Sequence, residues 1–271
     1  MLSVSGLIIG ISSLAVLLFC VAFGFHNFYH AKKMNADLLY LTGIIIICTG
    51  GFYLGVSVDF LLVIFTGENL VNFNGLHGVL GFMWTAPAIV SGMYLGATLI
   101  VPRAKKSIAI IYLTLAILFE FFLFVNPIET FIFNYPPING SELIDTNIVF
   151  GHPTFILIAI FLVSTLLFNG VGFLVKSRKT SGDLRRNFLY VGIGFIIFVG
   201  AAALDALIAP GPLVLIARFG MISYALLMFS GLEPMWTHQI THKSKKEESK
   251  ETKIMETESI EAESIEAESK L

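Results

Sequence analysis

The chain has 271 residues, of which 56% are hydrophobic and only 13% are charged, and its formal net charge is −2. A water-soluble domain could not keep so much apolar side chain off its surface, so the composition predicts an integral membrane protein whose first partner is the lipid bilayer. The near-neutral charge argues against nucleic acid as a second partner.

Seven apolar runs follow one another along the chain, and each is close to the roughly 20 residues that a helix needs to cross the hydrocarbon layer. The predicted spans are residues 4–25, 38–60, 76–100, 107–126, 150–175, 187–208 and 212–234. The first run has no Lys or Arg before it and no small-residue cleavage site, so we interpret it as a retained helix. The predicted fold class is an all-α integral membrane protein, a seven-transmembrane helix bundle over residues 1–240.

The positive charges are distributed on one side of this bundle. Of 17 Lys and Arg residues, 16 lie in the gaps after the first, third, fifth and seventh runs, and only Arg218 lies inside a run. Because basic loops stay cytoplasmic during insertion, this pattern predicts an N-terminus outside and a C-terminus inside. The predicted localisation is the cell membrane.

Residues 241–271 are rich in Lys, Glu, Ser and Thr and repeat the segment SIEAE, which predicts a disordered, low-complexity cytoplasmic tail. We expect no kinase, cyclase or other catalytic domain after the seventh run. A signal would then leave through a separate cytoplasmic partner.

A weak internal repeat links the second and sixth runs. Leu39-Tyr40 opens the second run and Asp59 lies near its end, while Leu189-Tyr190 and Asp205 take the same places in the sixth. Spans one to three and five to seven would then form a 3+1+3 parallel repeat around the fourth, as in some transporters and sensors.

Small residues and proline predict how the helices pack. The G-x-x-x-G pairs Gly6/Gly10, Gly51/Gly55 and Gly92/Gly96 let backbones approach closely, which favours packing faces within the monomer. Pro87 predicts a kink in the third span, and the two cysteines, Cys20 and Cys48, are interpreted as core residues.

Ionisable side chains inside spans are informative because a charge near the bilayer centre costs on the order of 3 kcal/mol. Six of them, from six different spans, share the predicted outer half and could line a water-filled cup that binds a ligand: Asp59, His77, Glu120, His152, Asp205 and Arg218. Asp205 and Arg218 lie on consecutive helices at similar depth, so they can pair. Two interpretations stay open: a structural ion pair, or Arg218 as the group that attracts an anionic or polar ligand.

Histidines suggest a further, weaker hypothesis. His26 and His30 repeat at i, i+4, as do His238 and His242, which places each pair on one helix face, and together they could form a four-histidine metal site. The alternative is anchoring at the headgroup level, because both pairs lie beside aromatic residues or lysines. His77 and His152 could ligate a metal or a haem, or act as interfacial hydrogen-bonding groups.

The last third of the chain carries a family resemblance. The basic loop at residues 176–186 is followed by Leu189, Tyr190, Gly192, Leu204-Asp205, Arg218, Gly220 and Gly231. In these features the chain resembles the seven-helix membrane sensor module at the N-terminus of many archaeal and bacterial histidine kinases. The resemblance implies a sensory input role in which the outer half receives the signal, here without an attached transmitter domain.

The first hypothesis is therefore a receptor-like sensor that binds a small molecule and relays the signal to a cytoplasmic partner. The alternatives are a small-solute transporter with parallel repeats and, third, an intramembrane metallohydrolase or haem protein, because His238 and His242 look like the histidine pair of seven-helix ceramidase-like hydrolases. Microbial rhodopsins are similar in span number, but the seventh run has no Lys to bind retinal, and no cofactor is predicted. Whether the protein is an enzyme stays open.

Overall fold

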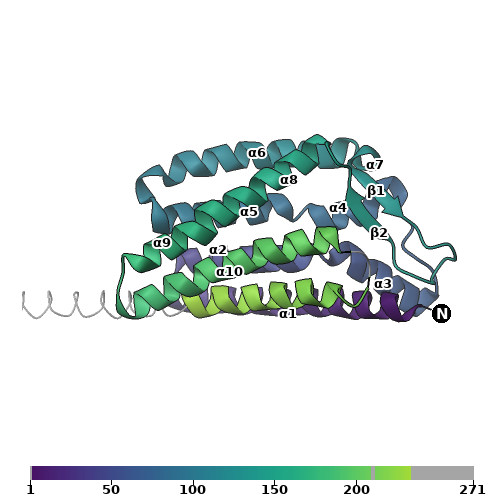
Figure 1. The fold of residues 1–271 in the computed structure, drawn as a ribbon, viewed down its shortest axis with the longest axis horizontal. Coiled ribbons are helices and arrows are strands. Elements are labelled where there is room, and N and C mark those ends of the chain that lie inside the picture. The colour runs from purple at the N-terminus through teal and green to yellow at the C-terminus, as the bar shows by residue number, and fades with distance from the viewer. Residues whose placement is uncertain (1, 209–210, 233–271) are drawn as a thin grey trace, which may run out of the picture.

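The computed structural model describes residues 2–208 and 211–232, which form a helical bundle with one small hairpin (Figure 1). The helices are α1 (Val4–Met34), α2 (Asp37–Gly51), α3 (Leu54–Thr66), η1 (Phe73–Gly75), α4 (Leu76–Phe82), α5 (Thr85–Ile100), η2 (Pro102–Ala104), α6 (Lys105–Val125), α7 (Pro127–Thr130), α8 (Pro153–Ser164), the π-helical segment η3 (Thr165–Val171), α9 (Gly172–Arg178), α10 (Gly182–Leu207) and Val214–Leu232, here called the last helix. Strands β1 (Phe131–Asn134) and β2 (Asp145–Ile148) pair antiparallel. The predicted all-α membrane bundle is confirmed at this level.

Six helices are long and apolar enough to cross a membrane, and the bent pair α2 and α3 makes a seventh if it is counted as one span. The main change in boundaries is at α1, which continues to Met34 instead of ending near residue 25. No Gly or Pro after residue 25 interrupts it, and it stops where Asn35 adopts a left-handed conformation with φ 48°.

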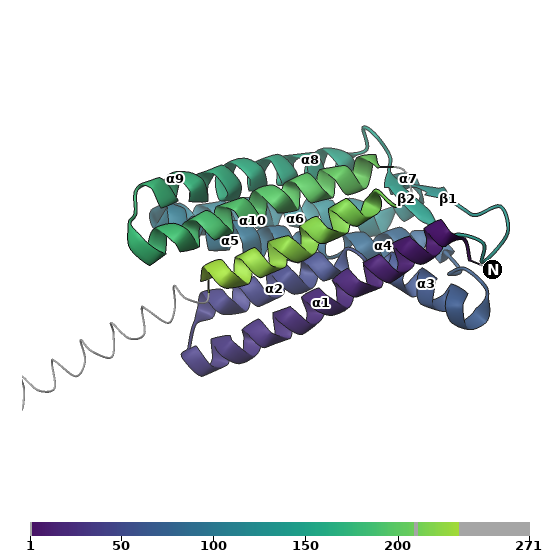
Figure 2. The same ribbon diagram turned by 60° about the horizontal axis from the view of Figure 1, so that its bottom comes forward.

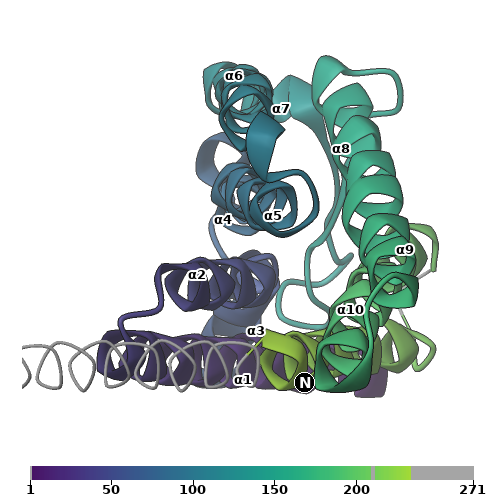
Figure 3. The ribbon, with the colours of Figure 1, turned by 90° about the vertical axis from the view of Figure 1, so that its left-hand side faces the viewer.

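The helices form two groups that meet along a shared core (Figure 3). In one group α2 packs against α1 and α5, and α5 packs against α6; in the other, η3 and α9 pack against α10. Buried side chains from both groups form one cluster, in which Ile46 and Leu95 meet Phe173, Phe195 and Tyr224. A second cluster joins α5 and α6 to α8 and the hairpin.

The two ends of the bundle differ in chemistry. The hairpin end carries the start of α1, the start of α4 and the strands, whereas the basic end carries the α5–α6 and α9–α10 connections (Figures 1 and 2). All described Lys and Arg residues except Arg218 lie at the end of α1, in these two connections or in the helix turns that flank them. The bundle is therefore strongly asymmetric in charge along its long axis.

Three of the apolar helices are interrupted. α2 and α3 are bent by 47° at Phe52-Tyr53. The interruption between α4 and α5 lies at Met83-Trp84, directly before the turn that contains Pro87, because a proline ring collides with the carbonyl group four residues earlier in a helix. The third interruption is the π-helical segment η3.

Glycines let these interrupted helices approach one another. A Cβ atom on Gly55 would collide with the carbonyl oxygen of His77, and one on Gly96 would collide with the side-chain oxygen of Asn169 in η3. The Asn169 amide nitrogen donates a hydrogen bond to the carbonyl of Gly92 at 3.2 Å. The prediction that Gly51/Gly55 and Gly92/Gly96 are packing faces within the monomer is therefore confirmed.

The outward surface of the bundle is apolar over whole helix faces. On α6, for example, Ile110, Ile117, Phe121 and Phe124 are each more than half exposed. An apolar surface of this extent would be unstable in water, and in lipid it is the expected exterior.

Candidate functional site

Arg218 is the centre of a polar cluster inside the bundle. Its Nη1 donates a hydrogen bond to the Asp205 carboxylate at 2.6 Å, so the two charges that the sequence placed at similar depth do pair. Its guanidinium carbon also lies 4.0 Å from the ring centre of Tyr53, at the bend between α2 and α3. One side chain thus joins the last helix, α10 and the α2–α3 bend.

Arg218 is well shielded from solvent, whereas the Asp205 side chain is 27% exposed. Arg218 is 6% exposed, and its side chain lies about 6 Å into the last helix, which starts at Val214, at a rise of about 1.5 Å per residue. Stacking of a guanidinium on an aromatic face contributes about 2 kcal/mol when both groups are desolvated. Tyr53 and Asp205 together therefore compensate a charge that would otherwise be costly to bury.

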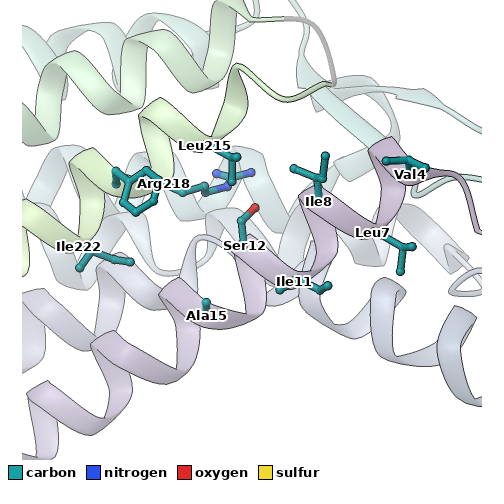
Figure 4. A pocket seen from close by; sticks show the side chains of 10 residues that line it. Val4, Leu7, Ile8, Ile11, Ser12, Ala15, Leu215, Arg218 and Ile222 are labelled. Carbon is teal, nitrogen blue, oxygen red and sulfur yellow. The ribbon is translucent and has the colours of Figure 1, made fainter.

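A cavity of about 400 Å³ opens beside Arg218, between the hairpin-end halves of α1 and the last helix (Figure 4). Its walls are aliphatic and aromatic side chains except for Ser12 and Arg218, and the Ser12 hydroxyl is directed toward the last helix. The two helices are close at their other ends, where the rings of Phe23 and Phe229 are 5.6 Å apart. The cavity therefore lies where the helix pair spreads apart.

The cavity wall is almost wholly apolar, and a hydrogen-bond donor of Arg218 lies buried behind it. Arg218 Nε is buried and has no hydrogen-bond partner among the described residues. A buried donor without an acceptor costs about 1–3 kcal/mol, which a ligand acceptor in the cavity would recover. The arrangement can bind a molecule that combines an apolar body with a carbonyl, hydroxyl or carboxylate oxygen, within the usual size range of ligand pockets.

Asp59 lies at the hairpin end and is fully buried. Its two carboxylate oxygens accept hydrogen bonds from the Asn69 side-chain amide at 3.1 and 3.2 Å, from the backbone N–H of Leu70 at 2.7 Å and from that of Ile144 at 2.8 Å. Asn69 also donates to the carbonyl of Glu142 and accepts from the N–H of Gly140. Asp59 therefore ties together the two connections at residues 67–72 and 135–144.

His77 is close to this cluster and is also buried, at 3% exposure. Its Nδ1 forms a 2.7 Å hydrogen bond with the hydroxyl of Thr146 on β2, which links α4 to the hairpin. Its Nε2 has no hydrogen-bond partner among the residues that the structure describes.

Glu120 and His152 occupy two further, separate settings. Glu120 is on α6 with both carboxyl oxygens shielded from solvent. His152 precedes α8, where its Nδ1 accepts a hydrogen bond from the backbone N–H of Thr154, so it caps this helix.

The structure thus divides the six predicted residues among four places: the Arg218 pair, the hairpin-end cluster, α6 and the start of α8. The sequence predicted one common cup for all six residues, and the cavity beside Arg218 is not that cup. Arg218 lines the cavity between α1 and the last helix, and the other five residues are not part of its wall. The reason is that Asp59, His77 and His152 are held by hydrogen bonds to neighbouring connections, strands and helix starts.

The sequence did not single out Tyr53 or Asn69, which are the main partners of Arg218 and Asp59. The signal for Tyr53 was its position directly after Gly50-Gly51-Phe52, where a helix is weak and can bend. Asn69 had no signal beyond lying in a polar connection, because its partners are 10 to 73 residues away in the chain.

The histidines His26 and His30 lie on one face of α1, as their spacing predicted. Their ring centres are 4.4 Å apart, and His26 also packs against the ring of Phe229 on the last helix. His30 contacts the ring of Tyr29 at 5.8 Å between ring centres. Both histidines therefore take part in an aromatic cluster near the basic end of α1.

The predicted metal site at these histidines is not formed by the described residues. Within residues 2–208 and 211–232, no group of three or more His, Cys, Asp or Glu side chains is arranged to hold a metal ion. Their ring contacts within the described chain are with each other, with Phe229 and with Tyr29. His238 and His242 lie outside the described residues, so the four-histidine hypothesis as a whole stays a prediction.

Cys20 and Cys48 are buried free thiols of the core, as predicted. Comparison with known proteins adds no assignment: no protein-family model matches the chain, and no curated protein is significantly similar to it.

Proposed function

We propose that this protein is a multi-pass membrane receptor-like sensor whose ligand binds at Arg218. The observation that carries the proposal is a buried guanidinium with an unpartnered Nε at the wall of a cavity of about 400 Å³. The same side chain is paired with Asp205 and stacked on Tyr53, so its position is sensitive to three elements at once. The ligand class is a small molecule with an apolar body and one hydrogen-bond acceptor.

The proposed orientation has the hairpin end and the N-terminus outside and the basic end in the cytoplasm of the cell. It is supported by the collection of described Lys and Arg residues at one end, which is the charge pattern of cytoplasmic loops. The 3+1+3 repeat stays part of the proposal, as does the relationship to the sensor modules of histidine kinases.

In this proposal, the signal is a change in how α10 and the last helix pack. A ligand acceptor that engages Nε of Arg218 changes how the guanidinium is held by Asp205 through Nη1, and the two residues lie on these two helices. α10 starts directly after the basic connection that contains Arg178 and Lys179, at the opposite end of the bundle. A ligand can shift the helix equilibrium only by the difference in its affinity for the two packings, and the Arg218–Asp205 bond is the contact that would differ.

Ligand binding is tested by native mass spectrometry of the protein purified in mild detergent from the membranes that produced it. We expect a co-purified small molecule on the wild type and its loss from Arg218→Leu. The matched control is Arg186→Leu, which removes an exposed cation that pairs with Asp183 at 3.3 Å. Equal adducts on all three proteins, or none on any, would contradict a site at Arg218.

Signal relay is tested by the distance between spin labels at the basic end, on Asn35→Cys and Ser181→Cys. We expect Asp205→Asn, which weakens the hold on Arg218, to change the distance distribution. The control is Phe119→Leu, a destabilising change in the other core cluster. If both variants only lower thermal stability and leave the distances unchanged, Asp205 and Arg218 form a structural ion pair and the relay is refuted.

A small-solute transporter is the second candidate, and the observation that favours it is the set of three interrupted helices. Interrupted spans that meet inside a bundle are typical of transport sites, because freed backbone groups can bind a substrate. Uptake of labelled amino acids, carboxylates or sugars into proteoliposomes, against protein-free vesicles, distinguishes the two. Accumulation that persists in Arg218→Leu would favour transport over sensing at this residue.

A further inference from the structure

A second cavity of about 420 Å³ lies at the basic end, far from Arg218, and has a different chemistry. It is enclosed by the start of α2, the end of α5 and the start of α6. Its polar lining comes from Asn35, Asp37, Tyr94, Thr98 and Lys105, and two leucines of α2 complete the wall. The cavity lies at the level where these helices begin or end, which in a membrane is the headgroup region.

Two donors in this cavity lack an obvious protein acceptor. The Lys105 Nζ lies 5.9 Å from the ring centre of Tyr94, and Lys105 forms no ion pair among the described residues. The hydroxyl of Thr98 is shielded from solvent and has no hydrogen-bond partner in the described part of the chain. A buried hydroxyl of this kind is stabilised by any ligand that supplies an acceptor oxygen.

The surrounding charge favours an anion. α2 and α6 both start at the cavity without a side-chain cap, so the positive ends of two helix dipoles add to Lys105. Lys32, Lys33, Arg103 and Lys106 lie within a few residues of these helix ends along the chain. Phosphate is the anion that helix starts and lysines bind most readily in proteins.

Asp37 adds a carboxylate to the cavity lining. A carboxylate repels any phosphate anion, but it accepts hydrogen bonds from hydroxyl groups, so a phosphodiester whose headgroup carries hydroxyls offers it partners that a bare phosphate lacks. The apolar wall formed by the leucines suits the first carbons of an acyl chain. The cavity therefore has one region for a phosphate, one for hydroxyls and one for hydrocarbon.

From these observations we propose that the basic-end cavity is a binding site for an anionic phospholipid with a hydroxylated headgroup, such as phosphatidylglycerol. Lys105 and Thr98 bind the phosphate, and Asp37 accepts hydrogen bonds from the headgroup hydroxyls. The proposal stands on a different cavity from the Arg218 site and does not depend on the proposed function.

The test is native mass spectrometry of the purified protein after exchange into nanodiscs that contain equal parts of phosphatidylglycerol and phosphatidylcholine. We expect one retained phosphatidylglycerol on the wild type, and about fivefold weaker retention in Lys105→Ala. The matched control is Lys106→Ala, which removes the same charge from a neighbouring, exposed position outside the cavity lining and should reduce retention less than Lys105→Ala does. Equal losses in the two variants would show only general attraction to the anionic membrane and would overturn the site.

Two further arms keep the result interpretable. Thr98→Val removes the hydroxyl while keeping the shape of the side chain, so weaker retention in a fully folded variant supports the phosphate position. Asp37→Ala should reduce the preference for phosphatidylglycerol over phosphatidic acid. The proposal would be overturned if the wild type retained phosphatidylethanolamine as well as it retains phosphatidylglycerol. It would also be overturned if inorganic phosphate displaced the retained phosphatidylglycerol and bound in its place.

Discussion

Replacing Asp59 by asparagine is the most informative single change at the hairpin end, because it removes a charge while keeping the size of the side chain. The Asp59 carboxylate is fully buried and accepts from three donor groups: the Asn69 amide and the backbone N–H groups of Leu70 and Ile144. An asparagine side chain has one acceptor oxygen and one NH2 group. One of the two backbone N–H groups would then face a donor instead of an acceptor.

The expected loss of stability follows from these contacts. A hydrogen bond to a charged group contributes about 1.5–3 kcal/mol, and a buried donor left without an acceptor costs about 1–3 kcal/mol. One lost bond and one orphaned N–H therefore predict that Asp59→Asn lowers the free energy of unfolding by about 3 kcal/mol. The connections at residues 67–72 and 135–144 should also loosen, since Asp59 and Asn69 hold them together.

The free energy is measured by unfolding in mixed micelles with increasing sodium dodecyl sulfate, followed by circular dichroism. Limited proteolysis reports the loosening of residues 135–144. Glu129→Gln is the control, because it neutralises an exposed carboxylate at the same end and should change stability by less than about 0.5 kcal/mol. If Asp59→Asn matches this control in both measurements, the reasoning is refuted and the carboxylate of Asp59 is available for a ligand.

Two further predictions each compare two residues, one pair of glycines with different surroundings and one pair joined by a hydrogen bond. Gly96→Ala should lower the free energy of unfolding by about 1–3 kcal/mol, because its Cβ would meet the side-chain oxygen of Asn169. Gly92→Ala should be close to neutral, since its Cβ would lie 3.8 Å from the nearest atom. Equal effects of the two variants on unfolding in micelles would contradict this packing. His77→Phe and Thr146→Val should each destabilise the hairpin. A double-mutant cycle of unfolding free energies should give a coupling energy of about 1 kcal/mol for their 2.7 Å hydrogen bond. A coupling energy near zero would mean that this hydrogen bond does not contribute to stability.

The sequence by itself determined the features that depend on composition and on neighbours along the chain. Apolar runs of span length predicted the helices, and the distribution of Lys and Arg predicted one basic end. The pairing of Asp205 with Arg218 was predictable for the same reason, because a short turn brings two residues 13 positions apart to the same depth. Two charges in an apolar environment have a strong reason to meet.

Other expectations depended on where the helices bend, and the sequence showed this only in part. Pro87 correctly indicated an interruption in its span, but the 47° bend at Phe52-Tyr53 was not predicted, and it is this bend that brings Tyr53 to Arg218. The hairpin was missed because its two strands, Phe131–Asn134 and Asp145–Ile148, are only four residues each. Local propensity is weak in such segments, and packing decides their conformation.

Only the tertiary structure decided which polar residues have partners. In the sequence, Asp59 looked as available for a ligand as Arg218 did. The Asp59 carboxylate is in fact saturated by hydrogen-bond donors, one of which lies 85 residues later in the chain. Arg218, which lines a cavity, has an Nε without a partner in the described part of the chain. Lys105 looked like one member of a basic loop, and the fold placed it in a cavity with Thr98 and Asp37. Hydrogen bonds act over about 3 Å, so whether a group is satisfied depends on contacts between distant segments, which the order of residues does not reveal until the chain is folded.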